Sequence, residues 1–99
     1  MGSETPGVLP DQVPEPSWEV RRRRYGEHRW LVRHNEVYEI DDITDAVWLG
    51  CGEGLTIGVI AQRVAADHGF SLPEAMGMTA RAVRALAHLG LVRLNQVQD

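Results

Sequence analysis

Four histidines and one cysteine are the residues of this chain best suited to catalysis or to metal binding, and their spacing supports neither. The histidines are His28, His34, His68 and His88. A zinc site needs spacings such as H-x-x-x-H, H-E-x-x-H or paired C-x-x-C, because neighbouring ligands must converge on one ion. None of these spacings is present. We therefore expect no metal, no cofactor and no enzymatic activity.

The single cysteine, Cys51, lies among glycines and has no recognised nucleophile context. It follows Gly50 at the predicted end of a helix, where the helix dipole disfavours a thiolate. The pattern Gly50-x-Gly52-x-Gly54 lacks the Gly-Lys-Ser/Thr of a phosphate-binding loop. We interpret the glycines as a helix stop followed by a turn, and the thiol as structural.

Three aspartates cluster where a strand pattern gives way to a helical one. Asp41, Asp42 and Asp45 lack the spacing and the terminal glutamate of a calcium loop. Acids are favourable at the start of a helix, where they meet free backbone N–H groups. We expect these three to cap the helix.

Charge is strongly segregated along a chain whose net charge is −4. Residues 18–34 carry a local charge of +4 and residues 35–56 one of −6. In a strand, alternation would place only two of the four arginines Arg21–Arg24 on the same face. We expect these arginines to be solvated and to pair with the acids beyond Asn35, so nucleic acid is not the expected partner.

Three short segments rich in aromatic and β-branched residues predict an antiparallel meander. They are residues 18–25, 28–33 and 36–41. Gly26 marks the first turn, and His34 begins the second. The third segment alternates, with Tyr38 and Ile40 on one face and Val37, Glu39 and Asp41 on the other, as is typical of a half-buried strand at a sheet edge.

The pattern after Asp41 is helical. The first predicted helix is short, capped by Asp42 or Thr44 and stopped by Gly50. Apolar residues at helical spacing predict a second helix that begins after Thr56 and ends at Gly69.

A third helix begins at a capping box. Ser71 and Glu74 have the spacing of such a box, and Pro73 occupies the first turn, where its missing N–H costs nothing. The helix reaches Leu89, and Gly90 ends it as a Schellman-like cap. Its polar side carries Arg81, Arg84 and His88, while the remaining surface is apolar around more of the circumference than one core contact requires.

These elements predict an α+β, winged-helix-like domain: a three-stranded antiparallel sheet followed by three helices, in the order βββααα. The predicted divisions are a flexible proline-rich arm over residues 1–17, the domain over 18–94 and a tail over 95–99. The 99 residues contain 43% hydrophobic residues, but no membrane span or signal-type stretch. One cysteine cannot form an internal disulfide, so we expect a cytoplasmic protein.

An edge strand beside a helix with spare apolar surface is what β-augmentation requires. An added peptide would pair its backbone with the strand over residues 37–41, while its apolar side chains enter the groove against the third helix. Such binding needs no catalysis. An unprotected edge can also pair with a second copy of itself, so the chain is expected to be a monomer or a weak edge-strand dimer.

Three segments also resemble a known family. They are residues 36–49 (EVYEIDDITDAVWL), 55–61 (LTIGVIA) and 85–92 (ALAHLGLV). Their order and spacing are similar to those of the pyrroloquinoline quinone biosynthesis protein D (PqqD-like) family, the precursor-peptide recognition element of ribosomally made, modified peptides. The resemblance covers roughly residues 18–94. One departure is Ile40-Asp41, where the family usually has leucine and asparagine.

The resemblance implies a non-catalytic domain that binds the leader segment of a precursor peptide as an added strand and delivers it to a modifying enzyme. Carried over by position, the implied leader-binding residues are Val37, Tyr38, Glu39, Ile40, Asp41, Met78, Arg81, Ala82, Ala85 and Leu86. Arg81 and Arg84 would steer acidic residues of the leader.

The alternative hypothesis is a winged-helix transcriptional regulator that binds DNA, because the same topology serves both functions. In that case the third helix would present Arg81 and Arg84 to the major groove. Salt dependence separates the two hypotheses, since DNA affinity falls steeply with salt, whereas strand addition depends on it only weakly.

Overall fold

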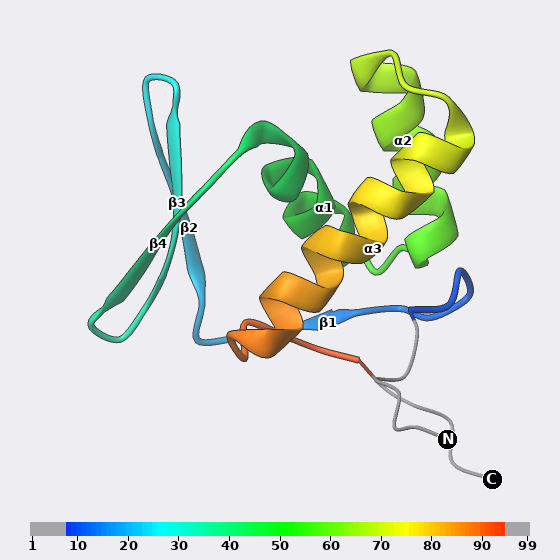
Figure 1. Ribbon diagram of the computed structural model, residues 1–99. Helices are drawn as coiled ribbons and strands as arrows, with labels where there is room; N and C mark the ends of the chain where they lie inside the picture. The colour runs from blue at the N-terminus through cyan, green and yellow to red at the C-terminus, as the bar shows by residue number, and fades with distance from the viewer. Residues whose placement is uncertain (1–7, 95–99) are drawn as a thin grey trace, which may run out of the picture.

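The computed structural model describes residues 8–94 and has two parts, a helical body and a three-stranded sheet beside it (Figure 1). Its elements are β1 (Glu15–Pro16), β2 (Arg21–Tyr25), β3 (His28–Arg33), β4 (Glu36–Ile40), α1 (Asp42–Gly52), α2 (Ile57–His68), α3 (Leu72–His88) and β5 (Val92–Arg93). The predicted sheet followed by three helices is confirmed. The predicted tail over residues 95–99 lies outside the described residues.

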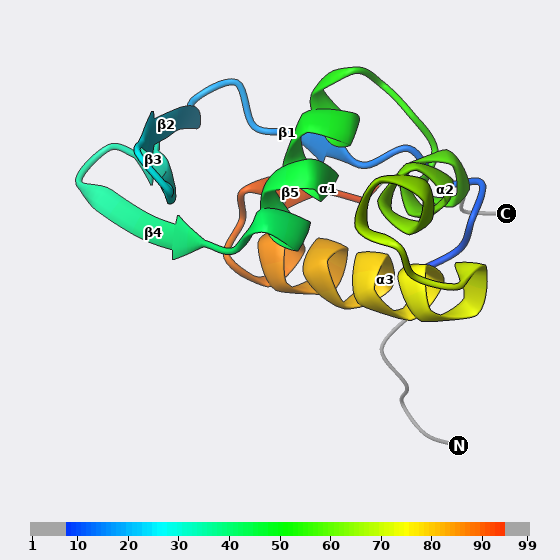
Figure 2. The same cartoon turned by 90° about the horizontal axis from the view of Figure 1, so that it is seen from above.

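The sheet has the strand order β2-β3-β4 and is antiparallel throughout. Leu31 pairs with Arg22 on one side and with Tyr38 on the other, which sets the register of all three strands. Leu31 is fully buried against the helices, so the face that carries it is the inner face. Viewed from above, β4 leads directly into α1 (Figure 2).

The three helices enclose the core, and local sequence signals define most of their ends. Thr56 caps α2, and Gly69 ends it with a φ of 75°. Ser71 and Glu74 form the predicted capping box of α3. Buried aliphatic residues of α2 and α3 pack on α1 and on Leu31.

The start and end of α1 differ from the prediction. The N-cap is Asp41, one of the three aspartates expected to cap the helix, and not Asp42 or Thr44; its side chain accepts a hydrogen bond from the Thr44 N–H at 2.8 Å. Gly50 lies inside the helix instead of stopping it. A Cβ at Gly50 would lie 2.7 Å from the side chain of Ile60, so glycine permits α1 and α2 to approach closely.

Residues 8–17, which the sequence predicted as part of a flexible arm, pack on the helical body. β1 pairs with β5, a strand that the sequence did not predict. Pro14 is fully buried. The carbonyl groups of Pro10 and Gln12 accept hydrogen bonds from the first N–H groups of α2, at 2.8 and 2.9 Å. The arm over residues 1–7 lies outside the described residues.

Candidate functional site

The outer edge of β4 is the first component of the candidate site. β4 pairs only with β3, so its other edge has no strand partner among residues 8–94. Arg33 and Glu36 flank a two-residue turn and form the first pair of the ladder. Because hydrogen-bonded and non-hydrogen-bonded pairs alternate in an antiparallel ladder, the backbone groups of Val37 and Glu39 point away from β3.

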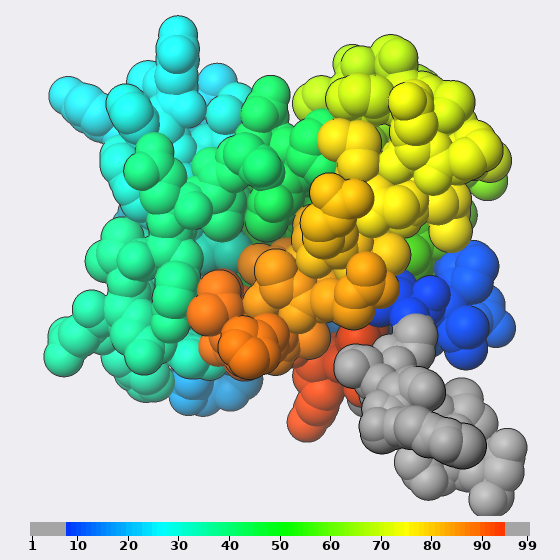
Figure 3. Space-filling model, in the orientation of Figure 1, coloured from blue at the N-terminus to red at the C-terminus, as the bar shows by residue number. Residues whose placement is uncertain are grey.

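Helix α3 lies alongside this edge, and two hollows open between them. The larger has a volume of about 460 Å³ and the smaller one of about 250 Å³. They share Asp41, Thr44 and Ala85, so together they form one continuous groove. Figure 3 shows β4 and the C-terminal half of α3 side by side on one face of the molecule.

The structure brings all ten predicted leader-binding residues to this groove. The larger hollow is lined by Val37, Tyr38, Glu39, Ile40, Asp41, Ala85 and Leu86, and the smaller one by Met78, Arg81 and Ala82 together with Asp41 and Ala85. Their role in binding stays a prediction.

The groove also contains four residues that are not among the ten predicted leader-binding residues: Ile43, Thr44, Leu89 and Leu91. Ile43 and Thr44 enter it because α1 begins directly after β4. Leu89 and Leu91 enter it because Gly90 turns the chain back with a φ of 77°. Leu89 and Leu91 flank the predicted cap at Gly90, and this was the sequence signal that could have indicated their position.

The floor of the groove is apolar and its rim is polar. Leu86 and Leu91 are buried, whereas Ala85 is exposed. Because the side chain of Ala85 is small, it leaves the groove open at the point where the two hollows meet. Hydrogen bonding to Glu36 raises the pKa of Tyr38. Hydrogen bonding to Arg33 lowers the pKa of Glu36. At neutral pH the phenol of Tyr38 is therefore neutral, and the groove keeps an apolar character.

One anchor between the sheet and α1 is an ion-pair cluster around Asp45. The carboxylate of Asp45, predicted as a capping group, is buried and lies between Arg22 and Arg29. Arg22 Nη2 donates to Asp45 Oδ2 at 2.9 Å. Arg29 Nε lies 3.1 Å from the same oxygen but is not aligned for a hydrogen bond. Hydrogen bonding to Asp45 raises the pKa of Arg22.

A second anchor joins the sheet to the end of α3. Arg33 donates to the carbonyl oxygens of Gly90 and Leu89, at 2.8 and 3.1 Å. It also lies 3.1 Å from Glu36. A Cβ at Gly90 would lie 3.1 Å from the Arg33 guanidinium. Glycine at this position therefore both adopts the positive φ and leaves room for the Arg33 side chain.

The two exposed arginines of α3 occupy different places. Arg81 lines the smaller hollow, whereas Arg84 lines neither hollow. Within residues 8–94, neither arginine makes a salt bridge. Only Arg81 is therefore placed to meet a charge on a ligand in the groove.

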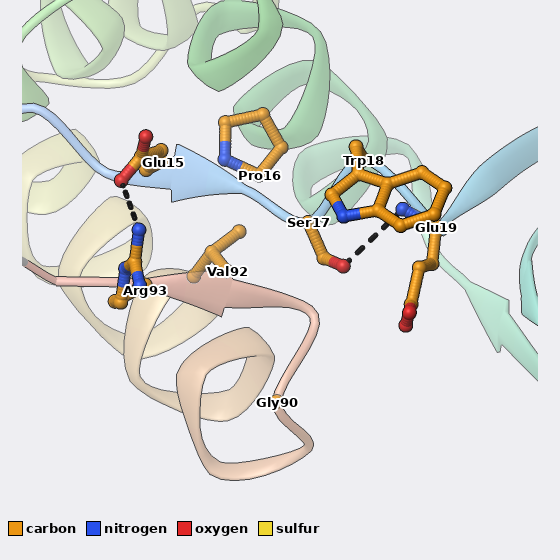
Figure 4. A pocket seen from close by; sticks show the side chains of 8 residues that line it. All are labelled: Glu15, Pro16, Ser17, Trp18, Glu19, Gly90, Val92 and Arg93. Carbon is orange, nitrogen blue, oxygen red and sulfur yellow. Dashed lines mark hydrogen bonds and ion pairs between the residues drawn. The ribbon is translucent and has the colours of Figure 1, made fainter.

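A separate hollow of about 420 Å³ lies where the β1–β5 pair meets the start of the sheet (Figure 4). Its rim carries Trp18, which is 88% exposed. Its charged groups already have partners: Glu15 pairs with Arg93 at 2.9 Å, and Glu19 with His34 at 3.3 Å. The strands that line it, β1 and β5, have only two residues each, so neither offers an edge as long as that of β4. We therefore place the candidate site in the groove between β4 and α3.

Other kinds of site find no support in the part of the chain that the structure describes. No group of three or more His, Cys, Asp or Glu residues there could hold a metal ion. No helix in this part is long and apolar enough to cross a membrane.

The fold is similar to that of TbiB1, whose structure was solved in complex with the TbiA(beta) leader peptide. The TM-score is 0.70 at 20% sequence identity, and the match covers 86% of this chain and 99% of that chain. No family model matches the chain, and no curated protein matches it in sequence. The likeness to TbiB1 establishes the fold, which is the fold that the family resemblance implied.

Proposed function

We propose that the protein binds the leader segment of a ribosomally made precursor peptide and presents it to a modifying enzyme, without catalysing a reaction itself. The observation that carries the proposal is the unpaired edge of β4 beside an apolar groove on α3. The peptide would add to β4 as a fourth strand. The likeness to TbiB1, described with a leader peptide, supports the same proposal.

Two kinds of contact contribute in this arrangement. Backbone hydrogen bonds to Val37 and Glu39 give affinity that does not depend on the peptide sequence. Alternate side chains of the peptide enter the two hollows and give specificity. Arg81, on the rim of the smaller hollow, steers an acidic residue of the leader, a contribution that is small because the guanidinium is exposed.

The first test is to titrate synthetic leader peptides into the ¹⁵N-labelled protein and to follow the amide shifts by NMR. The probes are the TbiA(beta) leader and peptides from short open reading frames beside the gene. We expect saturable amide shifts at residues 37–41 and along α3 from Met78 to Leu89. The DNA-binding hypothesis predicts instead no shifts with any leader, and salt-dependent shifts at Arg81 and Arg84 with duplex DNA.

A proline at position 39 tests whether the backbone edge is used. In Glu39→Pro the lost N–H is one that points away from β3, so the sheet keeps its ladder while the added strand loses a hydrogen bond. We expect the affinity for the leader to fall about tenfold or more. Glu39→Ala is the matched control, because it removes the carboxylate but keeps the N–H, and it should bind as the unmodified protein does. Equal losses in both variants would contradict strand addition.

A tryptophan at position 85 tests the groove itself. Ala85 is exposed and lies where the two hollows meet, so Ala85→Trp fills the groove without entering the core. We expect binding to be lost and the melting temperature to be retained. Ala66→Trp, at an exposed alanine of α2 outside the groove, is the control and should bind normally. Undiminished binding by Ala85→Trp would place the peptide elsewhere.

A further inference from the structure

The outer face of the sheet is opposite to the one that carries Leu31, and the proposed function uses only the edge of it, at Val37 and Glu39. Two cross-strand rows form its centre. One consists of Arg23, Trp30 and Glu39, and the other of Arg21, Val32 and Val37. No helix of the described chain covers this face, which points away from α1 (Figures 1 and 2).

Apolar residues on this face lie outside the main core. Trp30 and Val32 are only half-buried, do not belong to the core cluster and lie in the middle strand. Val37 is 61% exposed. His28 stacks on Trp30, with ring centroids 5.6 Å apart, and its Nδ1 lies 3.0 Å from Glu39. The indole is therefore held in place by its neighbours at the centre of an uncovered surface.

The charges of the central row are arranged so that the row is complementary to itself. It carries a cation on β2, an aromatic ring on β3 and an anion on β4. Consider a second copy related by a two-fold axis that runs parallel to the strands, between the two sheets and above β3. This rotation stacks β2 of one copy on β4 of the other, and it leaves each cross-strand row facing the same row of the other copy. It would place Arg23 of one copy opposite Glu39 of the other, and the two Trp30 rings opposite each other.

We propose that the outer face of the sheet is a self-association surface, on which two copies of this chain pack face to face as a small β-sandwich. Sheets packed in this way lie about 10 Å apart, with their strands within roughly 30° of each other. The contact leaves the outer edge of β4 free for a peptide. The inference does not depend on the proposed function.

The size of the face limits the area that the dimer can bury. A surface three strands wide and five residues long measures roughly 15 by 17 Å. Two such surfaces bury less than the ~1,200 Å² at which standard interfaces begin. Self-association is therefore weak, with a Kd of roughly 100 µM, and low ionic strength strengthens it.

Sedimentation equilibrium of the full chain, from about 5 to 500 µM, measures this association. We expect the average mass to rise from that of the 11.0 kDa monomer towards that of the dimer. Arg23→Glu and Glu39→Arg should each weaken association about tenfold, because each places like charges opposite one another. The double variant should recover to within about threefold of the unmodified protein, because the charge pairs re-form with their signs exchanged.

Arg24→Glu is the matched control, because it makes the same change of charge on the same strand but on the opposite face. It should associate as the unmodified protein does, and thermal melts should show that every variant is folded. A constant mass of 11.0 kDa at all concentrations would overturn the proposal. So would a double variant no better than the single ones.

Two alternatives, a dimer that pairs through the β4 edges and a nucleic acid bound to the outer face, give different results. If a leader peptide dissociates the dimer, the copies pair through the β4 edges and the face proposal is wrong. If a labelled oligothymidine binds and Arg23→Glu abolishes that binding while the protein stays monomeric, the face is a nucleic-acid surface. If the dimer persists at saturating leader, the proposal is supported.

Discussion

At the scale of single residues, Cys51 shows how burial controls chemistry. Its side chain is 2% exposed, and burial raises the pKa of the thiol to about 12. At pH 8 the thiol is therefore almost entirely protonated, whereas the thiolate is the form that reacts. We expect a disulfide reagent such as DTNB to label the native protein slowly, and the protein unfolded in guanidinium chloride within seconds. Rapid stoichiometric labelling of the native protein would contradict this.

The same shift has a consequence for stability against pH. The folded-state pKa lies above the ordinary value of 9.0, so the protonated thiol favours the folded state. This contribution is fully present below pH 9 and is lost as the pH rises from 9 towards 12. The difference in free energy of unfolding between the unmodified protein and Cys51→Ala should therefore narrow over that range.

The aspartates show which residue roles can be predicted from the sequence. Capping is local, so an acidic cap near residue 42 was predictable, although the residue is Asp41. The role of Asp45 was not, because its partners Arg22 and Arg29 come from two strands that precede it in the chain. Only the folded sheet brings those guanidinium groups over the first turn of α1.

At the scale of elements, the Asp45 cluster joins the sheet to the helical body. Asp45→Ala would leave two partly buried guanidinium groups without their anion, so we expect a loss of about 2 to 3 kcal/mol. Urea unfolding measures it. Glu53→Ala is the control, because it breaks the exposed Arg63–Glu53 pair and should cost much less. Similar losses in the two variants would contradict an anchoring role for Asp45.

Helices and long strands were predictable, but the shortest strands were not. The ends of α2 and α3 follow from Thr56, Gly69 and the Ser71 capping box, signals that act within a few residues. By contrast, β1 and β5 have two residues each and pair across the whole length of the domain. Two residues carry no periodicity, so only the tertiary structure reveals these strands.

At the scale of the whole molecule, the segment that precedes the sheet is part of the folded unit. Deletion of residues 1–17 would remove β1, the buried Pro14 and the carbonyl groups that meet the start of α2. We expect a loss of at least about 3 kcal/mol, or roughly 12 °C in Tm, measured by thermal melting. Deletion of residues 1–7 is the control and keeps all of these contacts. An unchanged Tm in the longer deletion would contradict the packing described.

Ten of the residues that line the groove were predicted from the sequence, but its shape was not. Alternation in residues 36–41 indicated an edge strand, and the excess apolar surface of the third helix indicated a facing wall. The sequence could not show that Ala85 joins two hollows into one groove, because that depends on how α1 starts. It also could not show that Arg81 faces the groove while Arg84 does not.

The Arg33 anchor affects how fast a ligand can bind. Hydrogen bonds to Gly90 and Leu89 join one end of the sheet to α3, while the Asp45 cluster joins the sheet to α1. With both contacts in place, the two sides of the groove are preorganised. Most of the conformational entropy lost on binding would then be lost by the peptide. Under the proposed function, we expect association to proceed without a slow opening step, and we expect different peptide sequences to differ mainly in their dissociation rates.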